Sequence, residues 1–348
     1  MKSFLKNASS KSLMMYFLFT IFFSMLFICN AQEADKTGKP APKPLYRDPV
    51  YDGAADPVII WNKQEKKWFM FYTNRRAKAE GLDGVTWVHG TRIGIAESTD
   101  GGATWQYRDT CNIPSPFTET HWAPEVIEHD GTYHMYLSYV PGIFTNWEHP
   151  RHIIHLTSEN MIDWKYESTL NLASDKVIDA CIMQLPDSTW HMWYNNEVDA
   201  KSIYYADSKD LYNWEDKGKA VGDQKGEGPK VFKWKDKYWM VTDVWQGLAL
   251  YESDDLISWN RIPGNLLQEP GEGNEDMVVG HHPDVVVNNG RAYLFYFTHP
   301  GQVDSIPDDN LYEKRRSSIQ VVELGYKDNK IICDRNKTTY IDLQPPIQ

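Results

Sequence analysis

The chain has 348 residues, of which 41% are hydrophobic and 14% aromatic, and its formal net charge is −12. This acidic balance disfavours nucleic acid and anionic membranes as partners, because both require clustered Lys and Arg side chains. The aromatic content provides ample core material, and beyond the first thirty residues no segment is apolar enough to cross a membrane.

The first residues have the layout of an export signal. A basic start is followed by an apolar run over residues 13–28 and by a small-residue exit that ends at Ala31. This pattern predicts a signal peptide over residues 1–31 and a mature protein that is exported, either periplasmic or secreted. An amino-terminal membrane anchor is the alternative, because the apolar run is nearly long enough to span a bilayer. Lipidation of Cys29 is less favoured, because Ile28 is a bulky neighbour for that signal.

Residues 32–44 are polar and Pro-rich, which predicts a tether ahead of a single domain over residues 45–348. Three cysteines remain beyond the signal, Cys111, Cys181 and Cys333, and they have neither the pattern of a disulfide framework nor metal-ligand spacing. The domain must therefore be stabilised by its hydrophobic core, and we expect it to be a monomer.

An aromatic-rich strand recurs five times along this domain. Four copies share an aromatic-x-Met core and the fifth is looser: WFMFYT (68–73), YHMYLS (133–138), WHMWYN (190–195), YWMVTD (238–243) and AYLFYF (292–297). A turn-forming stretch precedes each copy, and another apolar strand precedes each turn: DPVIIW (56–61), PEVIEH (124–129), ACIMQL (180–185), PKVFKW (229–234) and PDVVVN (283–288). Each such pair is typical of a β-hairpin.

The rest of each unit supplies two more strands. A third strand follows every hairpin, and in four units it runs into a Ser/Asp turn that ends in Trp: STDGGATW (98–105), SENMIDW (158–164), SKDLYNW (208–214) and SDDLISW (253–259). Ser and Asp side chains bond the backbone of such turns, and a fourth short strand completes the unit. Four antiparallel strands repeated five times predict an all-β fold, a five-bladed β-propeller with four-stranded blades. A β-sandwich is the alternative, but it would not require the same four-strand sequence pattern to recur about every fifty residues.

In a propeller the innermost strand of each blade lines the central channel, so the starts of these strands converge. Aligned on their apolar cores, the five inner strands begin with Asp56, Ala123, Asp179, Gly228 and His282. Beside this column stand Glu125, Glu227, His281 and Asp284. Acidic residues this close to apolar strand starts predict a site on the axis and not a solvated surface.

Each of these candidates also has a structural alternative. Asp56 precedes a proline and fits a turn at a strand start. Asp179 lies between apolar neighbours, where an unpaired carboxylate is costly, and Glu227 lies between two glycines that allow a ligand to approach closely. Glu125 lies further along its strand and either lines the pocket or pairs with a neighbour. The two histidines of the fifth strand are either core histidines or, as a pair at one strand start, reach the axis.

Four tryptophans have no place in the repeat: Trp87, Trp122, Trp147 and Trp245. The other ten belong to the repeated turns and strands and are core residues by default. Aromatic rings stack on the apolar faces of sugars, so the four are candidate walls of a carbohydrate site. Packing within the loops is the alternative for each.

Three acidic residues from three blades supply the groups that glycoside cleavage requires. A carboxylic acid protonates the leaving oxygen, and a second carboxylate activates water or attacks the sugar. The acid must stay protonated near neutral pH, so its pKa has to be raised by burial or by a nearby like charge. Asp56, Asp179 and Glu227 provide a base, an acid and a third carboxylate that orients or tunes the acid, and this chemistry requires no cofactor.

These residues resemble those of glycoside hydrolase family 43 and its five-bladed relatives. The matching segments occur in the family's order, one in each blade: ADPVI (55–59), HWAPEVI (121–127), VIDACI (177–182), GEGPKVF (226–232) and GHHPDVVV (280–287). The resemblance implies that Asp56 is the general base, Glu227 the general acid and Asp179 the carboxylate that tunes and orients the acid. It also implies inversion at the anomeric carbon, and His281 or His282 near a bound water or cation, such as a structural calcium ion at the axis.

The chain departs from the family pattern where the substrate would be selected. The third motif reads Asp-Ala-Cys where the family usually has Asp-Pro, and the fifth carries an added Pro-Asp. The long loops 75–92 and 140–152 have no counterpart in the pattern, so the sugar stays open within plant or algal poly- and oligosaccharides. Arg75, Arg76 and Arg92 of the first loop are candidates to bind a carboxylate or sulfate on the sugar, with a solvated arginine as the alternative.

Other functions remain open at this point. The STDGGATW segment also matches the Asp-box turn of sialidases, but those enzymes need an Arg cluster and a Tyr nucleophile. A related propeller family carries out phosphorolysis and would need a cationic phosphate pocket near the base. A propeller that only binds glycans would have little reason to keep all three carboxylates, and a structural adhesion propeller accounts least well for Glu227.

Overall fold

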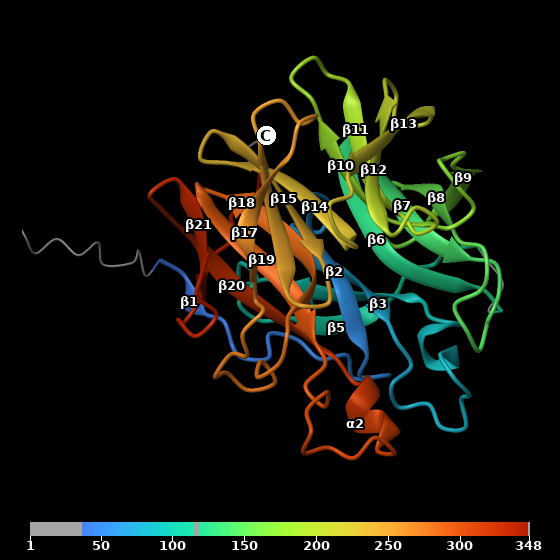
Figure 1. Ribbon diagram of the computed structural model, residues 1–348, viewed down its shortest axis with the longest axis vertical. Helices are drawn as coiled ribbons and strands as arrows, with labels where there is room; N and C mark the ends of the chain where they lie inside the picture. The colour runs from blue at the N-terminus through green and yellow to red at the C-terminus, as the bar shows by residue number, and fades with distance from the viewer. Residues whose placement is uncertain (1–36, 115–117, 347–348) are drawn as a thin grey trace, which may run out of the picture. The chain divides into compact units, whose positions relative to one another are not determined.

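The computed structural model describes residues 37–114 and 118–346. In these residues, five four-stranded antiparallel sheets each keep their strands in chain order, as Figure 1 shows. The blades contain β2 (Ala54–Asn62), β3 (Lys67–Asn74), β4 (Ile93–Ser98) and β5 (Gln106–Thr110); β6 (Thr120–His129), β7 (Thr132–Val140), β8 (His152–Ser158) and β9 (Lys165–Thr169); β10 (Val177–Gln184), β11 (Trp190–Asn196), β12 (Ser202–Ser208) and β13 (Trp214–Val221); β14 (Glu227–Trp234), β15 (Lys237–Asp243), β16 (Leu248–Ser253) and β17 (Asn260–Leu266); and β18 (His281–Asn288), β19 (Arg291–Thr298), β20 (Ser318–Lys327) and β21 (Lys330–Cys333).

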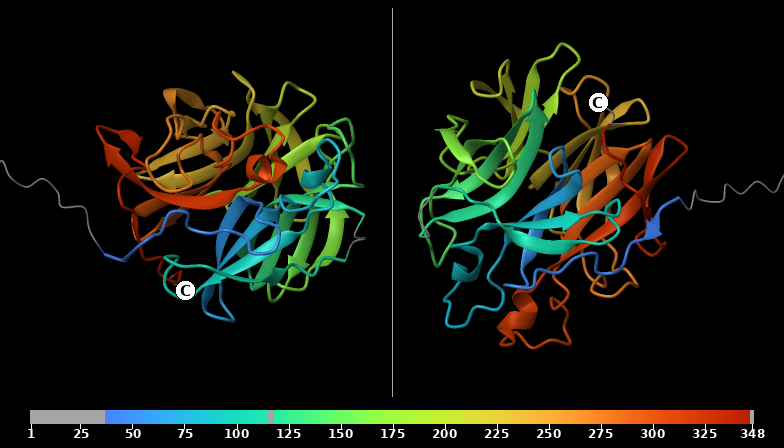
Figure 2. Two further views of the ribbon diagram at one scale, coloured as in Figure 1. Left: turned by 90° about the horizontal axis from the view of Figure 1, so that it is seen from below. Right: turned by 180° about the vertical axis from the view of Figure 1, so that it is seen from behind.

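The first strands of the five blades form a closed ring. Each of β2, β6, β10, β14 and β18 contacts the corresponding strand of the two neighbouring blades, so that β18 of the last blade meets β2 of the first. The two views of Figure 2 show the sheets set around one axis. The predicted five-bladed propeller is confirmed.

The second strand of each blade carries the core. Four repeat methionines and the equivalent leucine are fully buried: Met70, Met135, Met192, Met240 and Leu294. Five hydrophobic clusters fill the five interfaces between neighbouring blades. The predicted dependence on the core is consistent with the three described cysteines, which are all free.

The Ser/Asp turns join the third and fourth strands of the first four blades. The serine that ends each third strand is buried, and its Oγ accepts a backbone amide of the turn: Gly102 N to Ser98 (3.0 Å), Met161 N to Ser158 (2.8 Å), Leu211 N to Ser208 (2.9 Å) and Leu256 N to Ser253 (2.8 Å). The predicted role of these side chains in the turns is therefore confirmed.

The segment predicted as a tether is described from residue 37 onward, and there it is packed against the domain. Its strand β1 (Lys39–Pro40) pairs antiparallel with β22 (Tyr340–Ile341) near the end of the chain. The tether prediction is wrong for these residues, because backbone pairing and ion pairs hold them despite their polar, Pro-rich composition. The predicted signal peptide, residues 1–31, lies outside the described residues.

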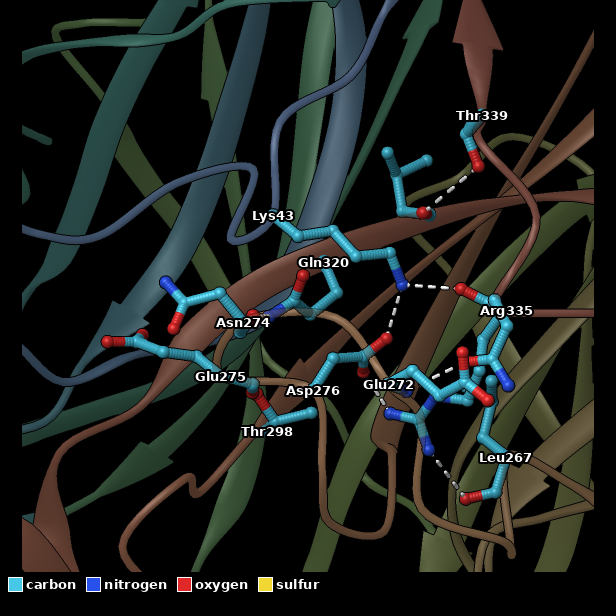
Figure 3. Close-up of polar contacts among 12 residues, drawn as sticks. Lys43, Leu267, Glu272, Asn274, Glu275, Asp276, Thr298, Gln320, Arg335 and Thr339 are labelled. Carbon is cyan, nitrogen blue, oxygen red and sulfur yellow. Dashed lines mark hydrogen bonds and ion pairs between the residues drawn. The ribbon is translucent and has the colours of Figure 1, made fainter.

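One buried carboxylate, Asp276 in the connection between the last two blades, contacts both ends of the domain. It is fully buried and forms ion pairs with Lys43 of the amino-terminal segment and with Arg335 of the carboxy-terminal segment (Figure 3). Lys43 Nζ also donates to the Arg335 carbonyl (2.6 Å), and the Tyr296 hydroxyl donates to Asp276 (3.0 Å). These contacts hold the amino-terminal and carboxy-terminal segments against the connection between the fourth and fifth blades.

We expect the substitution Asp276→Asn to lower the free energy of unfolding by about 3–5 kcal/mol, because it leaves the buried Arg335 guanidinium without its counter-charge. Urea denaturation followed by tryptophan fluorescence measures the change. The control is Asp328→Asn in the exposed β20–β21 turn, which should stay within about 0.5 kcal/mol of the parent. Equal stability of the two variants would contradict a stabilising role for the ion pairs of Asp276 with Lys43 and Arg335.

Helices are few and short in the described part of the chain: a 3-10 turn over Thr86–Val88 and α2 (Leu311–Arg315). Within residues 37–114 and 118–346, no helix has the length and apolar character needed to cross a membrane.

Candidate active site

Every inner strand carries a β-bulge at the same place, and the bulge positions the site. The register against the second strand shifts once in each blade, at the residues of the aligned column. The first bulge residue has a left-handed backbone in all five blades: Asp56 (φ 52°), Ala123 (φ 37°), Asp179 (φ 61°), Gly228 (φ 55°) and His282 (φ 31°). Gly adopts this conformation freely and Asp, Asn and His do so more readily than other residues; Ala123 is the strained member of the column, and such strain and bulges are concentrated at functional sites.

In three blades, the last residue of the repeated second-strand segment accepts a hydrogen bond from the bulge of the next blade. Thr73 Oγ1 accepts from Ala123 N (2.8 Å), and Ser138 Oγ accepts from Asp179 N (2.8 Å). Asp243 of the fourth blade accepts from His282 N (3.1 Å) in the same way. The neighbouring blade therefore holds the backbone of the bulges at Ala123, Asp179 and His282.

Asp56 is buried beside a cation. Arg75 Nη2 lies 3.2 Å from Asp56 Oδ1 and His282 Nδ1 lies 3.5 Å from the same oxygen. Burial raises the pKa of Asp56, but the charges of Arg75 and His282 and a hydrogen bond from Thr73 outweigh it, and the pKa is lowered. Asp56 is therefore ionised at neutral pH and can accept a proton.

Asp179 lies on β10 of the third blade, two blades along the ring from Asp56. Its Oδ2 accepts from Gly228 N (3.0 Å). Burial and the charges of Glu227 and Asp56 raise the pKa of Asp179 well above its ordinary value. Gly228 is required at its position, because a Cβ there would lie 2.8 Å from His282 Nδ1 and the backbone is left-handed.

Glu227 lies at the start of β14 and faces a lysine from the preceding blade. Lys201 Nζ is 3.3 Å from Glu227 Oε2 and also contacts Glu197, which in turn pairs with Arg151. Burial raises the pKa of Glu227 to about 7, with the charges of Asp243 and Glu197 adding to it and that of Lys201 opposing it. Glu227 can therefore hold a proton close to neutral pH.

The structure thus brings the three predicted carboxylates together from three blades. Asp56 is held ionised, whereas Asp179 and Glu227 retain a proton between them near neutral pH. Two titratable groups whose environments push their pKa values apart can serve as a base and an acid in one reaction.

Glu125 does not line this site. It is buried two residues beyond the bulge of its strand and pairs with Lys230 Nζ (2.9 Å). The prediction of Glu125 as a substrate-binding residue is wrong, and the alternative of a paired carboxylate holds. Glu125 lies deeper along the propeller axis than the three carboxylates, because the second residue after a bulge belongs to the next layer of side chains in the channel.

The two predicted histidines differ in their contacts. His281 Nδ1 pairs with Asp243 (3.1 Å) and its ring stacks on Phe297. His282 stands between Asp56 and the backbone of Gly228. His282 is therefore the histidine next to the predicted base. His281 instead packs between Asp243 of the fourth blade and Phe297 of its own blade.

Three of the four predicted tryptophans lie in loops at the end of the propeller where the inner strands begin. That end holds the loops after each second strand, because the two strands are antiparallel. Trp147 is 50% exposed and Trp245 is 40% exposed, with Lys201 Nζ 5.3 Å from the centre of the Trp245 ring. Trp87 is half-buried against His299.

Trp122 is not a wall of the site. It is 9% exposed, and its indole donates to Val88 O (2.6 Å) beneath the loop that carries Trp147. Its predicted role in carbohydrate binding is wrong, because the long first and second loops cover it. Arg92 is half-buried and faces the charge of Glu119. The arginine of the first loop that contacts a predicted catalytic carboxylate is Arg75.

Several residues of the site were not predicted. Four of the five repeated second-strand segments end in a polar residue at one position of the repeat, namely Thr73, Ser138, Asn195 and Asp243, so Asp243 could have been found from the sequence. No pattern pointed to Lys201, Glu197 or Arg151, because their loops differ from blade to blade.

Two cavities lie away from the three carboxylates. One of about 260 Å³ is lined by Ile113, Glu119, Tyr139 and Tyr166, and one of about 500 Å³ by Ala77, Glu80, Leu311 and Arg315. Neither is lined by Asp56, Asp179 or Glu227. The candidate site therefore rests on the carboxylates and not on the size of a cavity.

Comparison with known proteins gives a family and a fold. A family model described as a probable glycosyl hydrolase domain, related to glycoside hydrolase family 43, matches residues 45–263. No curated protein sequence matches the chain.

Solved structures with the same fold share little sequence with the chain. A thermostable family-43 glycoside hydrolase has a TM-score of 0.62 at 18% identity, over 86% of this chain and 98% of that chain. A GH43 beta-xylosidase/alpha-arabinofuranosidase from a compost microbial metagenome, in complex with xylotriose, has a TM-score of 0.60 at 15% identity, over 85% and 97%. The GH32 beta-fructofuranosidase BmSUC1 of Bombyx mori has 0.60 at 15%, over 84% and 67%. Likeness at this level of identity establishes the fold alone.

Proposed function

The chain belongs to the family of probable glycosyl hydrolase domains related to glycoside hydrolase family 43, and we propose that it cleaves a glycosidic bond with inversion, using Asp56 as base and Glu227 as acid. Asp56 takes a proton from a water molecule as that water attacks the anomeric carbon. Glu227 gives a proton to the departing oxygen on the other side of the sugar. Asp179 orients and tunes the acid.

The observation that carries this proposal is that two carboxylates on the ring of inner strands have pKa values shifted in opposite directions: that of Asp56 is lowered and that of Glu227 is raised. Arg75 and His282 keep Asp56 ionised, and burial keeps Glu227 protonated up to a pH of about 7. Activity should therefore decline as the pH falls through the lowered pKa of the base and as it rises through that of the acid.

The proposed substrate is a plant or algal poly- or oligosaccharide that enters from the end of the propeller where the inner strands begin. Trp147 and Trp245 rise there from the loops of two blades and expose their rings. A flat aromatic face suits the apolar face of a pyranose or furanose ring. The two tryptophans lie on either side of the third blade, which supplies Asp179 and Lys201.

The proposal is tested by incubating the protein with aryl pentosides, aryl hexosides and plant and algal polysaccharides. The blank is the double variant Asp56→Asn/Glu227→Gln, in which both carboxylates are neutral amides. Sugar release by the parent chain alone is the expected result. Retention of a glycan on affinity gels by both proteins, with no release by either, would replace the hydrolase with a glycan-binding propeller.

We expect Lys201→Met to move the alkaline limb of the pH–rate profile to higher pH. The positive charge of Lys201 lowers the pKa of Glu227 from what burial alone would give, so its loss raises that pKa. A protonated acid is then available at a pH where the parent enzyme has lost its own. The measurement is kcat/KM against pH, with Lys201→Arg as the control that keeps the charge. An unmoved limb in Lys201→Met would show that Glu227 is not the titrating acid.

A further inference from the structure

A second layer of side chains lies on the axis beneath the bulges. The residues two positions beyond the left-handed column are Val58, Glu125, Cys181, Lys230 and Asp284. Each belongs to the inner strand of a different blade. The layer thus contains one cation, two carboxylates, a thiol and an isopropyl group.

Lys230 is bound by both carboxylates of this layer. Its Nζ lies 2.9 Å from Glu125 Oε2 of the second blade and 2.9 Å from Asp284 Oδ1 of the fifth blade. The Lys230 side chain is 15% exposed, and those of the two carboxylates are 6% and 3% exposed. Burial lowers the pKa of Lys230, but the charges of Asp284 and Glu125 outweigh it, and the pKa is raised well above the ordinary value.

The same two carboxylates also accept hydrogen bonds from the first and third blades. Asp284 Oδ2 accepts from Ile59 N of the first blade (2.8 Å). Glu125 Oε1 accepts from Ile182 N of the third blade (3.1 Å). The Lys230 ammonium group therefore links all five inner strands. Lys230 itself belongs to β14, and its ion pairs reach β6 and β18. The two carboxylates in turn accept hydrogen bonds from backbone amides of β2 and β10.

The residues of this layer, which lies two positions beyond His282 along the inner strands, do not fit a calcium ion. Calcium requires six to eight oxygen ligands at about 2.3–2.6 Å, and Lys230 already occupies the space between the two carboxylates. A divalent cation in that space would meet the lysine's positive charge at close range. The two carboxylates are oxygen ligands of the kind that calcium prefers, so it is the lysine that keeps a divalent ion out of this layer.

We propose that Lys230 is a built-in axial cation, which takes the structural place of a metal ion, and that shortening it converts the axis into a divalent-cation site. The wild-type fold then needs no calcium at this layer. Lys230→Ala removes the ammonium group and most of the side chain, leaving Glu125 and Asp284 facing a space that calcium and water can enter. Lys230→Met removes the charge and fills most of the space, so it offers no such room.

The test is thermal unfolding of the full chain in EDTA and in millimolar calcium chloride. The wild-type Tm should be the same in both, and both variants should unfold about 5–10 °C lower in EDTA, because two buried carboxylates lose their counter-charge. Calcium should restore several degrees to Lys230→Ala and little to Lys230→Met. The double variant Lys230→Ala/Glu125→Gln, with one carboxylate fewer, should require at least tenfold more calcium for the same gain.

Two results would overturn the proposal. One is a calcium-dependent rise in the wild-type Tm as large as that of Lys230→Ala. The other is a Lys230→Ala variant that gains nothing from calcium, whether it folds alone or stays unfolded in both buffers. Folding of that variant only when calcium is present would support the proposal. None of these readouts depends on catalytic activity, so they stay separate from the test of the proposed hydrolase.

Discussion

Glu227→Gln is expected to lower kcat on unactivated oligosaccharides by about 10²–10⁴-fold while leaving the fold intact. A glutamine has the size of the glutamate but cannot give a proton to the departing oxygen. On aryl glycosides with acidic phenol leaving groups the loss should be much smaller, because such groups leave without protonation. The alkaline limb near pH 7, where Glu227 loses its proton, should also disappear from the profile.

A matched control exists on the same blade. Glu252 pairs with Lys237 (2.8 Å) much as Glu227 pairs with Lys201, but it lies on β16, away from the inner strand. Glu252→Gln should therefore keep nearly full activity on both kinds of substrate. Equal losses for Glu227→Gln on activated and unactivated glycosides would contradict the role of Glu227 as acid, because an acid's importance depends on the leaving group.

The fold and the positions of the three carboxylates were predictable because the chain repeats. Aligning the inner strands on their apolar cores gave the correct column, since the bulge falls at the same residue in every blade. The left-handed backbone at Asp56 and Asp179 was not visible in the sequence, because neither residue type demands it. At Asp179 a hydrogen bond to the preceding blade supports that backbone, because its amide donates to Ser138 Oγ.

The partners of the carboxylates were not predictable, because they come from segments without a repeat. Lys201 and Glu197 lie in a connection of the third blade, yet they determine the electrostatics of Glu227 in the fourth. The wrong prediction for Glu125 has a related cause. A one-dimensional pattern places it beside the column, but only the three-dimensional stacking of layers shows that Lys230 lies across the axis from it.

Asp56→Asn is expected to lower kcat by about 10²–10⁴-fold on both activated and unactivated glycosides. Water must be deprotonated as it attacks, whatever the leaving group, so a good leaving group does not compensate for a missing base. This separates the variant from Glu227→Gln, whose loss depends on the leaving group. The asparagine keeps the shape of the side chain and tolerates the left-handed backbone of Asp56 (φ 52°), so the bulge should survive.

The control for this variant is Asp130→Asn, which makes the same change at a left-handed residue (φ 49°) in the exposed β6–β7 turn. It should retain parental activity and Tm. If Asp56→Asn instead kept its activity on aryl glycosides while losing it on natural ones, Asp56 would be acting as the acid. The two carboxylates would then exchange roles. The electrostatics argue against that exchange, because Arg75 and His282 stabilise the ionised form of Asp56, whereas burial favours the protonated form of Glu227.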